Sequence, residues 1–173
     1  MKPYVIISVF LAGVYHFLPS WAETQQTELI AYHQAIQANP KDATAYFNRG
    51  RVYEYLKNYD KALSDYSQAI ALNQEDDWSY AARATLYQAL KQYENALADY
   101  TKIIQINPKS SWAYYLRGKT YDDLKQYDKA LADYTQALQL SPKFVEAAER
   151  HAFVSKMLTQ SDKAKEEHAK TPF

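Results

Sequence analysis

The sequence predicts an all-α solenoid in which one helix–turn–helix unit is copied and stacked. A 34-residue period places Tyr46, Tyr80 and Tyr114 in one register, and eight other positions recur with the same spacing. Within each unit, apolar and small residues recur three or four positions apart, as on helices with one buried face. Pro108 and Pro142 close two of the units, because proline has no amide hydrogen to donate and ends a helix. A fixed period of this length indicates stacked copies, not a single globular core.

The first 22 residues differ from the rest of the chain and predict a secretory signal peptide. Lys2 precedes an apolar stretch over 5–18. Cleavage is predicted after Ala22, because the small residues Ser20 and Ala22 would then stand at the third and the first position before the cleaved bond. The apolar stretch has about 14 residues, short of the ~20 that span a bilayer. An uncleaved membrane anchor is the alternative. After cleavage we expect no membrane insertion, so the mature protein would be periplasmic or secreted.

The composition favours one kind of source and argues against one class of partner. The chain has no cysteine and no Asn-x-Ser/Thr acceptor for glycosylation, which together favour a bacterial exported protein. It has 20 basic and 20 acidic residues, so its formal net charge is zero. A nucleic-acid partner usually requires a basic face, and we therefore expect none.

The first unit shows why each copy is a helical hairpin. Tyr46 lies on one helical stripe, Lys57-Asn58 interrupts the pattern, and Tyr59 begins a second stripe of the same period. Gly50 lies inside the first helix, where glycine costs ~1 kcal/mol relative to alanine. We expect that close approach of the second helix offsets this cost. Tyrosine rings would fill the gaps around the contact, and their hydroxyls can remain at its edge, wet or hydrogen-bonded.

The repeated residues resemble the tetratricopeptide repeat. The order is Tyr, Arg-Gly, Tyr, Leu, Tyr, Ala-Leu, Asp-Tyr, Ala-Ile and Asn-Pro, and the period matches that family. The resemblance implies a right-handed superhelical solenoid with three full repeats, over residues 42–75, 76–109 and 110–143. Arg49 departs from the family pattern, which more often has leucine there. Because the fold serves many partners, the resemblance alone does not specify a function.

The flanking segments predict half-repeat caps. Residues 23–41 contain a helix that lies in register with the second helix of the next unit, and this helix would cover the first repeat. Residues 144–173 would form C-terminal capping helices and a tail. We expect one helix over 143–158 and a last short helix over 162–169, capped by Ser161-Asp162. A degenerate and charged end is what a solenoid needs to stop in water.

An arginine and an aspartate recur together in every unit, sixteen residues apart. The structural interpretation is an ion pair between the two helices of a hairpin or with a neighbour, since an unpaired buried charge is very costly. The alternative is a set of anion-binding arginines. We favour the structural interpretation because every unit carries both signs. The pairs are Arg49/Asp65, Arg83/Asp99 and Arg117/Asp133.

The positions that vary between units predict the binding site. The family resemblance implies that the inner face of the first helix of each repeat lines a concave groove. Aromatic anchors and a few charges are typical of peptide-binding surfaces. The predicted partner-binding residues are Phe47, Asn48, Arg51, Tyr55, Trp78, Gln88, Trp112, Tyr115, Lys119 and Asp122. Trp78 and Trp112 could instead pack between neighbouring helices.

The carboxylate clamp of the chaperone-binding members is not predicted. In those members a lysine stands three residues before the glycine and an asparagine follows it. Gly50 is instead flanked by Phe47 and Arg51, so neither clamp position matches.

Signals for catalysis are nearly absent from the sequence. The histidines are scattered, none pairs with another at metal-binding spacing, and there is no glycine-rich phosphate loop. We therefore expect no catalytic residue, metal or cofactor. Asp76-Asp77 and Asp122-Asp123 are interpreted as solvated helix ends and not as a catalytic dyad.

The predicted function is an exported scaffold or adaptor that binds a peptide or protein segment in its concave groove. Location and fold suggest, by analogy, a role in cell-envelope assembly. The alternative is a structural component that associates with itself through its terminal helices into a homo-oligomer. An enzyme is a remote third alternative.

Overall fold

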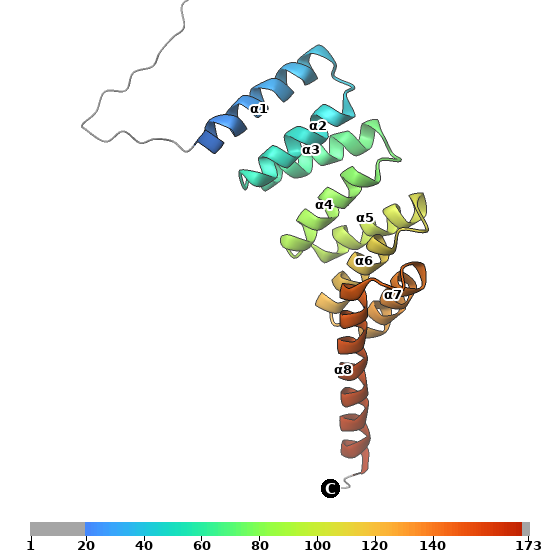
Figure 1. Ribbon diagram of the computed structural model, residues 1–173. Helices are drawn as coiled ribbons and strands as arrows, with labels where there is room; N and C mark the ends of the chain where they lie inside the picture. The colour runs from blue at the N-terminus through green and yellow to red at the C-terminus, as the bar shows by residue number, and fades with distance from the viewer. Residues whose placement is uncertain (1–19, 171–173) are drawn as a thin grey trace, which may run out of the picture.

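The computed structural model describes residues 20–170, which form eight α-helices and no strand within that range (Figure 1). In chain order they are α1 (Ser20–Ala38), α2 (Ala43–Tyr55), α3 (Tyr59–Leu72), α4 (Asp77–Ala89), α5 (Tyr93–Ile106), α6 (Ser111–Asp123), α7 (Tyr127–Leu140) and α8 (Val145–Lys170). Residues 1–19 of the predicted signal peptide lie outside the described residues, and its last three residues begin α1.

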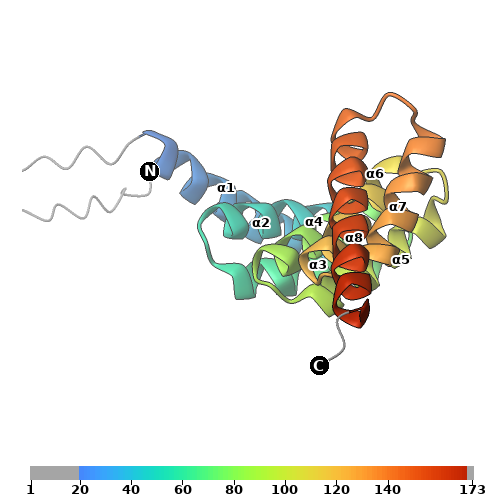
Figure 2. The same cartoon turned by 90° about the horizontal axis from the view of Figure 1, so that it is seen from below.

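The helices from α2 to α7 form three hairpins stacked in chain order, α2–α3, α4–α5 and α6–α7 (Figure 1). Each hairpin packs on the next one, through α3 on α4 and through α5 on α6. At the two ends, α1 packs on α2 and α8 packs on α7 and α6, as Figure 2 shows for α8. This arrangement confirms the predicted all-α solenoid of stacked helical hairpins. We call α2, α4 and α6 the A helices and α3, α5 and α7 the B helices.

Each A helix begins at a residue whose side chain caps it. Asp42 accepts a hydrogen bond from the amide of Ala45 at 3.0 Å, and Ser110 accepts one from Ala113 at 3.3 Å. Asp76 accepts from the amide of its near neighbour Trp78 at 3.2 Å. A side-chain oxygen here satisfies an amide that has no partner within the helix.

Each A helix is followed, after a leucine cap, by a lysine in the left-handed region. The φ angles of Lys57, Lys91 and Lys125 are 59°, 60° and 58°. A residue in this conformation turns the chain sharply after a helix, and glycine usually supplies it because glycine lacks a Cβ. Lysine therefore adopts an unfavourable backbone angle at the same turn of all three repeats.

The centre of each hairpin is built from small residues and one tyrosine ring. Tyr66 is fully buried between α2 and α3, and Ala62 on the same helix is equally inaccessible. A Cβ atom added to Gly50 would lie 2.8 Å from Cε1 of Tyr66, which is closer than normal packing permits. The prediction that Gly50 allows close approach of the two helices is confirmed.

The repeated arginine and aspartate form ion pairs inside each hairpin. Nε and Nη2 of Arg83 donate to the two carboxylate oxygens of Asp99 at 2.8 and 2.7 Å. Arg49 and Arg117 make the same paired contact in the other two repeats. Hydrogen bonding to the carboxylate raises the pKa of each arginine, which outweighs the effect of burial. The structural interpretation of this pair is confirmed.

Two of these arginines, Arg83 and Arg117, also join neighbouring repeats. Nη1 of Arg83 donates to the hydroxyl of Ser67 on α3 at 2.8 Å, and Nη1 of Arg117 donates to Thr101 on α5 at 3.2 Å. The guanidinium of Arg83 further lies 5.8 Å from the ring centre of Tyr80. One residue type therefore links the two helices of a hairpin and the hairpin to the preceding one.

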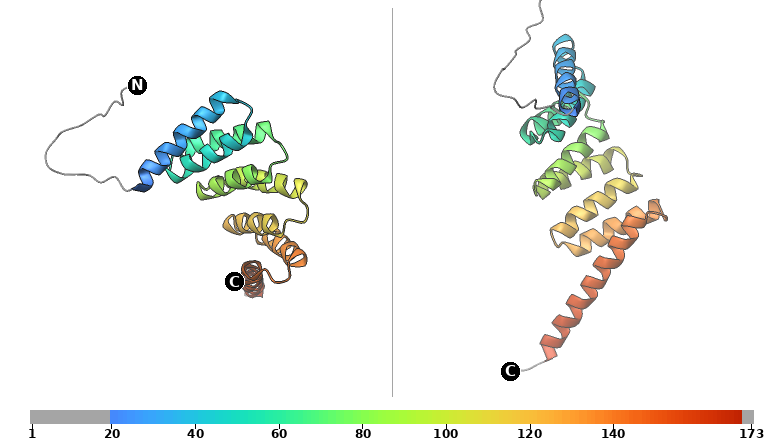
Figure 3. Two further views of the ribbon diagram at one scale, coloured as in Figure 1. Left: turned by 45° about the horizontal axis from the view of Figure 1, so that its top comes forward. Right: turned by 60° about the vertical axis from the view of Figure 1, so that its left-hand side comes forward.

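The C-terminal end differs from the prediction. α8 is continuous from Val145 to Lys170, so the predicted separate helix over 162–169 is wrong. Ser161-Asp162 does not begin a new helix, because no glycine or proline lies between Lys143 and Thr171 to end the first one. Figure 3 shows the second half of α8 extending beyond the other helices.

Candidate functional site on the inner face of the A helices

The predicted partner-binding residues fall into distinct environments along the A helices. We call the side of α2, α4 and α6 that carries them the inner face. Asn48, Arg51 and Tyr55 on α2 line a hollow of about 490 Å³ together with Glu28 and Tyr32 of α1. The hollow is mostly polar in its side chains, so it suits hydrogen bonding more than burial of an apolar group. α1 therefore contributes one wall to the inner face, as well as covering α2.

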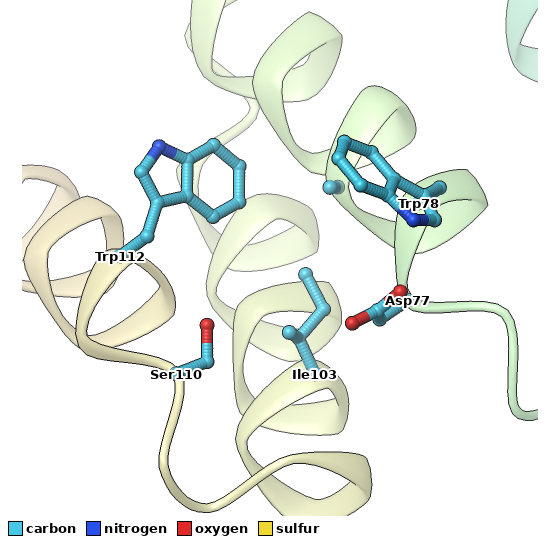
Figure 4. Close-up of a pocket in the computed structure, with 6 residues that line it drawn as sticks. Asp77, Trp78, Ile103, Ser110 and Trp112 are labelled. Atoms are coloured by element: carbon cyan, nitrogen blue, oxygen red, sulfur yellow. The ribbon is translucent and has the colours of Figure 1, made fainter.

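Trp78 and Trp112 are not part of the hydrophobic core. Their residues remain 73% and 44% exposed, and they line a pocket of about 410 Å³ between α4 and α6 (Figure 4). Ile103 of α5 lies between the two indoles in the view of Figure 4. We call this pocket the tryptophan notch. Its lining residues are Asp77, Trp78, Ala81, Ile103, Ser110 and Trp112.

The notch exists because the second repeat lacks a ring that the other two repeats have. Phe47 in repeat 1 packs 5.9 Å from the ring of Tyr66, and Tyr115 in repeat 3 packs 6.0 Å from Tyr134. The residue in the same register of repeat 2 is Ala81, which leaves that space open.

The floor and one wall of the notch follow from two further differences. Ile103 stands where repeats 1 and 3 have Ala69 and Ala137, so an apolar side chain closes the bottom. The edge of Trp112 then contacts the ring of Tyr100, with centroids 6.5 Å apart and planes at 84°. Edge-to-face contact of this kind holds an aromatic ring in place. The Trp112 wall is therefore preorganised, whereas Trp78 extends into solvent.

Phe47 and Tyr115 lie in the packing of the repeats more than on the open surface. Both are partly buried, and Tyr115 also contacts the ring of Phe144 at 4.9 Å. Arg51 lies with its guanidinium 6.0 Å from the ring centre of Phe47 and is itself exposed. Of these three, Arg51 is the one that is open to a partner.

Gln88 takes part in a contact that sequence reasoning missed, and the same contact recurs in repeat 1. The hydroxyl of the buried Tyr66 donates a 2.5 Å hydrogen bond to Glu54, and that of Tyr100 donates a 3.3 Å bond to Gln88. Gln88 in turn donates to Asp123 on α6 at 2.9 Å. The hydroxyls of Tyr66 and Tyr100 are therefore hydrogen-bonded, which is one of the two states expected for them. Burial raises the pKa of Tyr100 to about 12.

The third copy of this contact is incomplete. Tyr134 is fully buried, and its hydroxyl lies near Asp122 but makes no hydrogen bond of normal geometry within the part of the chain that the structure describes. Asp122 occupies the register of Glu54 and is one methylene shorter. Its carboxylate lies 3.8 Å from Nη1 of Arg150 on α8. Burial raises the pKa of Asp122, and the positive charge of Arg150 partly opposes that shift.

Lys119 lies one turn before Asp122 on α6 and is partly buried. It makes no hydrogen bond or ion pair with the described residues, so its charge remains available on the inner face. Position in the repeat therefore predicts a helix face, but it does not show which residues of that face are already engaged.

The described residues form neither a metal site nor a membrane-spanning helix. Between residues 20 and 170, no group of three histidine or acidic side chains is arranged to hold a metal ion. In the same range, none of the helices combines the length and apolar character that crossing a bilayer demands.

The chain is similar to known repeat proteins. The sequence model of the Tetratricopeptide repeat family matches residues 43–76, 78–110 and 111–144, which together make up more than half of the chain. No curated protein is similar enough in sequence to count as a relative.

Several solved structures have the same fold. The OM64 TPR domain of Arabidopsis is 30% identical, with a TM-score of 0.62 over 66% of this chain and 95% of that one. The first TPR of Spaghetti (RPAP3), bound to the HSP90 peptide SRMEEVD, is 26% identical, with a TM-score of 0.63 over 68% and 93%. MamA 41-end from Desulfovibrio magneticus RS-1 is 19% identical, with a TM-score of 0.72 over 87% and 85%, a likeness of fold alone.

Proposed function

Because the chain belongs to the tetratricopeptide repeat family, we propose that it is a scaffold whose inner face binds a segment of another protein. The observation that carries this proposal is the pair of exposed indoles, Trp78 and Trp112, at the mouth of an apolar notch. Large aromatic side chains that are held in place but left open to solvent are typical anchors of protein interfaces. The fold is typical of proteins that bind partners without catalysing a reaction.

A similar structure supports this proposal by example. The first TPR of RPAP3 was solved with a bound peptide, and it aligns with 68% of this chain. The present chain lacks the lysine and asparagine that would flank Gly50 in a carboxylate clamp, since Phe47 and Arg51 stand there. We therefore propose peptide binding through a different set of contacts.

Each inner-face residue would have a distinct part in this binding. The notch would hold one side chain of the segment and supply most of the buried apolar area. Asn48, Arg51 and Lys119 would fix the direction of the segment through hydrogen bonds and charge, because they lie on either side of the notch. Glu54 and Gln88 would contribute less, since they already bond tyrosine hydroxyls.

Export and a role in cell-envelope assembly form a second, separate part of the proposal. It rests on the signal-like sequence over residues 1–22. Amino-terminal sequencing of the protein recovered from its cellular compartment tests it. A mature chain that begins at Glu23 in an exported fraction would support export, and an intact terminus on a cytosolic chain would contradict it.

The binding proposal can be tested with a selected peptide. Peptides selected for binding to the full chain would be titrated against wild type and against Arg51→Ala/Trp112→Ala/Lys119→Ala. We expect affinity to fall at least about tenfold, because these changes remove one anchor and two charges. The matched control is Gln68→Ala/Gln105→Ala/Thr135→Ala, which changes three exposed residues of the B helices. Equal loss in both variants, or loss in the control alone, would overturn the proposal.

Self-association is the second candidate function, and the two ends of the stack favour it. α1 lies in the register of a B helix without its own A helix, and α8 begins in the register of an A helix without a B helix. Ala148 and Ala152 on α8 are exposed, whereas Gly118 of α6, which shares the register of Ala152, is buried against Tyr134 of α7. Sedimentation of the full chain and of a chain beginning at Lys41 tests this candidate. An oligomer that the truncation abolishes would support it.

A further inference from the structure

We infer that the tryptophan notch receives a basic side chain, lysine or arginine, from the bound segment. This inference rests on the proposed function, because it names the chemistry of one contact within the same inner face. It follows from the shape, the lining and the charge of the notch, which the family resemblance does not supply.

The shape of the notch suits one long side chain. Its volume of about 410 Å³ lies between two A helices, and the indoles of Trp78 and Trp112 stand on either side of it (Figure 4). Ile103 forms an apolar floor, and on α4 the small Ala81 leaves space beside Trp78. An aliphatic stem can therefore lie between the indoles above Ile103, where it loses contact with water.

The charge of the notch is negative once the helix ends are counted. The N-termini of α4 and α6 border it, and each carries about half a positive charge. Asp76 offsets these ends, since it accepts hydrogen bonds from the amide of Trp78 and the hydroxyl of Ser79. Asp77 makes no hydrogen bond or ion pair with the described residues, so its charge is in surplus. Figure 4 shows its carboxylate turned toward Ile103, at the floor of the notch.

Cation and indole also attract each other. A positive group within about 6 Å of an indole face gains roughly 0.5–1 kcal/mol at an exposed site. None of the described residues that line the notch is basic, so no side chain of the repeat already fills this role. Lys109 is adjacent to Ser110 in the chain but is exposed and does not line the notch. An acidic side chain would meet the unpaired carboxylate of Asp77 and would be repelled.

The test uses three blocked tripeptides that differ only in their central side chain. Ac-Gly-Lys-Gly-NH2, Ac-Gly-Nle-Gly-NH2 and Ac-Gly-Glu-Gly-NH2 would be titrated into the full chain at low ionic strength. The indole N–H resonances of Trp78 and Trp112 report binding in the notch. We expect the lysine peptide to bind about fivefold more tightly than the norleucine peptide, with no detectable binding of the glutamate peptide.

Two variants separate the contributions of charge and shape. Asp77→Asn should reduce the preference for lysine over norleucine from about fivefold to about twofold, because it removes the counter-charge but keeps the indoles that attract the cation. Ala81→Phe/Ile103→Ala reproduces the residue pair of repeat 1, Phe47 and Ala69, and should abolish the indole response to every peptide. Unchanged melting temperatures would show that both variants fold.

The outcomes distinguish this inference from the proposed function. Equal binding of norleucine and lysine, tighter binding of glutamate, or no response of either indole would overturn the basic specificity. None of these results affects the binding of a selected peptide to the inner face, which the triple-alanine comparison tests separately. A lysine preference that is undiminished in Asp77→Asn would likewise contradict the proposed charge pair.

Discussion

Repeats 1 and 3 differ from repeat 2 on the inner face, although all three share the same ion-paired centre. In repeats 1 and 3, Phe47 and Tyr115 pack against the buried tyrosine of the same hairpin. In repeat 2, Ala81 leaves this space open, and two indoles border it. Beside α4 there is therefore an open pocket that a ligand can enter. The equivalent positions of α2 and α6 carry rings that pack against the buried tyrosine.

This difference shows how a solenoid separates stability from recognition. The arginine–aspartate pair, the buried tyrosine and the small residue on the A helix are the same or nearly the same in each repeat, and they hold the hairpin together. The inner positions are free to differ because they do not determine the approach of the two helices. Changes at the first set should cost stability, and changes at the second set should cost binding.

The largest effect should come from breaking one ion pair. Asp99→Ala leaves the guanidinium of Arg83 largely buried without its carboxylate, and we expect it to lower the free energy of unfolding by about 3 kcal/mol. Chemical denaturation of the full chain measures this value. Arg83→Met/Asp99→Leu should recover most of the loss, because two apolar residues can occupy a buried pair's place.

A matched control for this prediction is the loose pair at the C-terminal cap. Arg150 lies 3.8 Å from Asp122 and its side chain is 47% exposed, so Arg150→Ala should change the free energy of unfolding by less than about 1 kcal/mol. Similar losses in Asp99→Ala and Arg150→Ala would contradict the central role of the inter-helix pair.

The next effect separates two buried tyrosines that occupy the same register. Tyr66→Phe removes a hydrogen bond to Glu54 and leaves that carboxylate without its donor, so we expect a loss of about 1–2 kcal/mol. Tyr134→Phe removes a buried hydroxyl with no hydrogen bond to the described residues, and it should change stability by less than about 0.5 kcal/mol. Thermal unfolding of both variants measures the difference.

A complementary variant should complete the third contact. Asp122→Glu adds the methylene by which Asp122 is shorter than Glu54, so its carboxylate should reach the hydroxyl of Tyr134. We expect a gain of about 1 kcal/mol, since a buried hydroxyl without a partner is costly. Destabilisation by Asp122→Glu, together with a loss in Tyr134→Phe, would show that Tyr134 already has a partner.

A smaller effect is expected at the turns between A and B helices. Lys91 has a φ of 60°, so Lys91→Gly should relieve backbone strain and raise the free energy of unfolding by about 0.5–1 kcal/mol. Lys102 lies inside α5, and Lys102→Gly should lower stability by about 1 kcal/mol. The two lysine-to-glycine variants should change the free energy of unfolding in opposite directions. Changes in the same direction would contradict the backbone strain assigned to Lys91.

The smallest effect concerns acid. Burial raises the pKa of Asp122 in the folded state above its ordinary value of 3.8. A raised pKa means that the folded state favours the protonated carboxyl of Asp122. The stability that this carboxyl contributes is therefore present below the unfolded pKa and is lost as pH rises through the folded pKa. Asp122→Asn should therefore gain stability relative to wild type at neutral pH, and the gain should shrink toward about pH 4. A difference that does not vary with pH would contradict the raised pKa.

The sequence predicted most of the fold because the fold repeats. The 34-residue period identified the hairpins and the glycine contact, and the constant spacing of Arg83 and Asp99 predicted their pairing. The end of the chain was harder to predict. Ser161 resembled a helix cap, but a cap begins a helix only where the preceding helix has already ended.

The site was predicted only in part, because position on a helix does not show which side chains are already engaged. Trp78 and Gln88 share the inner face of α4, yet the first is exposed and the second bonds two neighbours. The notch exists because the short side chain of Ala81 leaves a space open. This space becomes visible only when the three repeats are compared in the structure. The sequence nonetheless contains a signal for the notch. Ala81 is small where repeat 1 has the large Phe47, and Ile103 is large where repeat 1 has the small Ala69.

The central claim is that the inner face of the A helices binds a partner segment, and that the B helices and the ends of the stack do not. The most direct measurement is a map of amide and indole chemical shifts of the full chain, with and without a selected peptide. The account predicts the largest changes at Arg51, Trp78, Trp112 and Lys119. Changes confined to Gln68 and Gln105 on the B helices, or to α1 and α8, would contradict it.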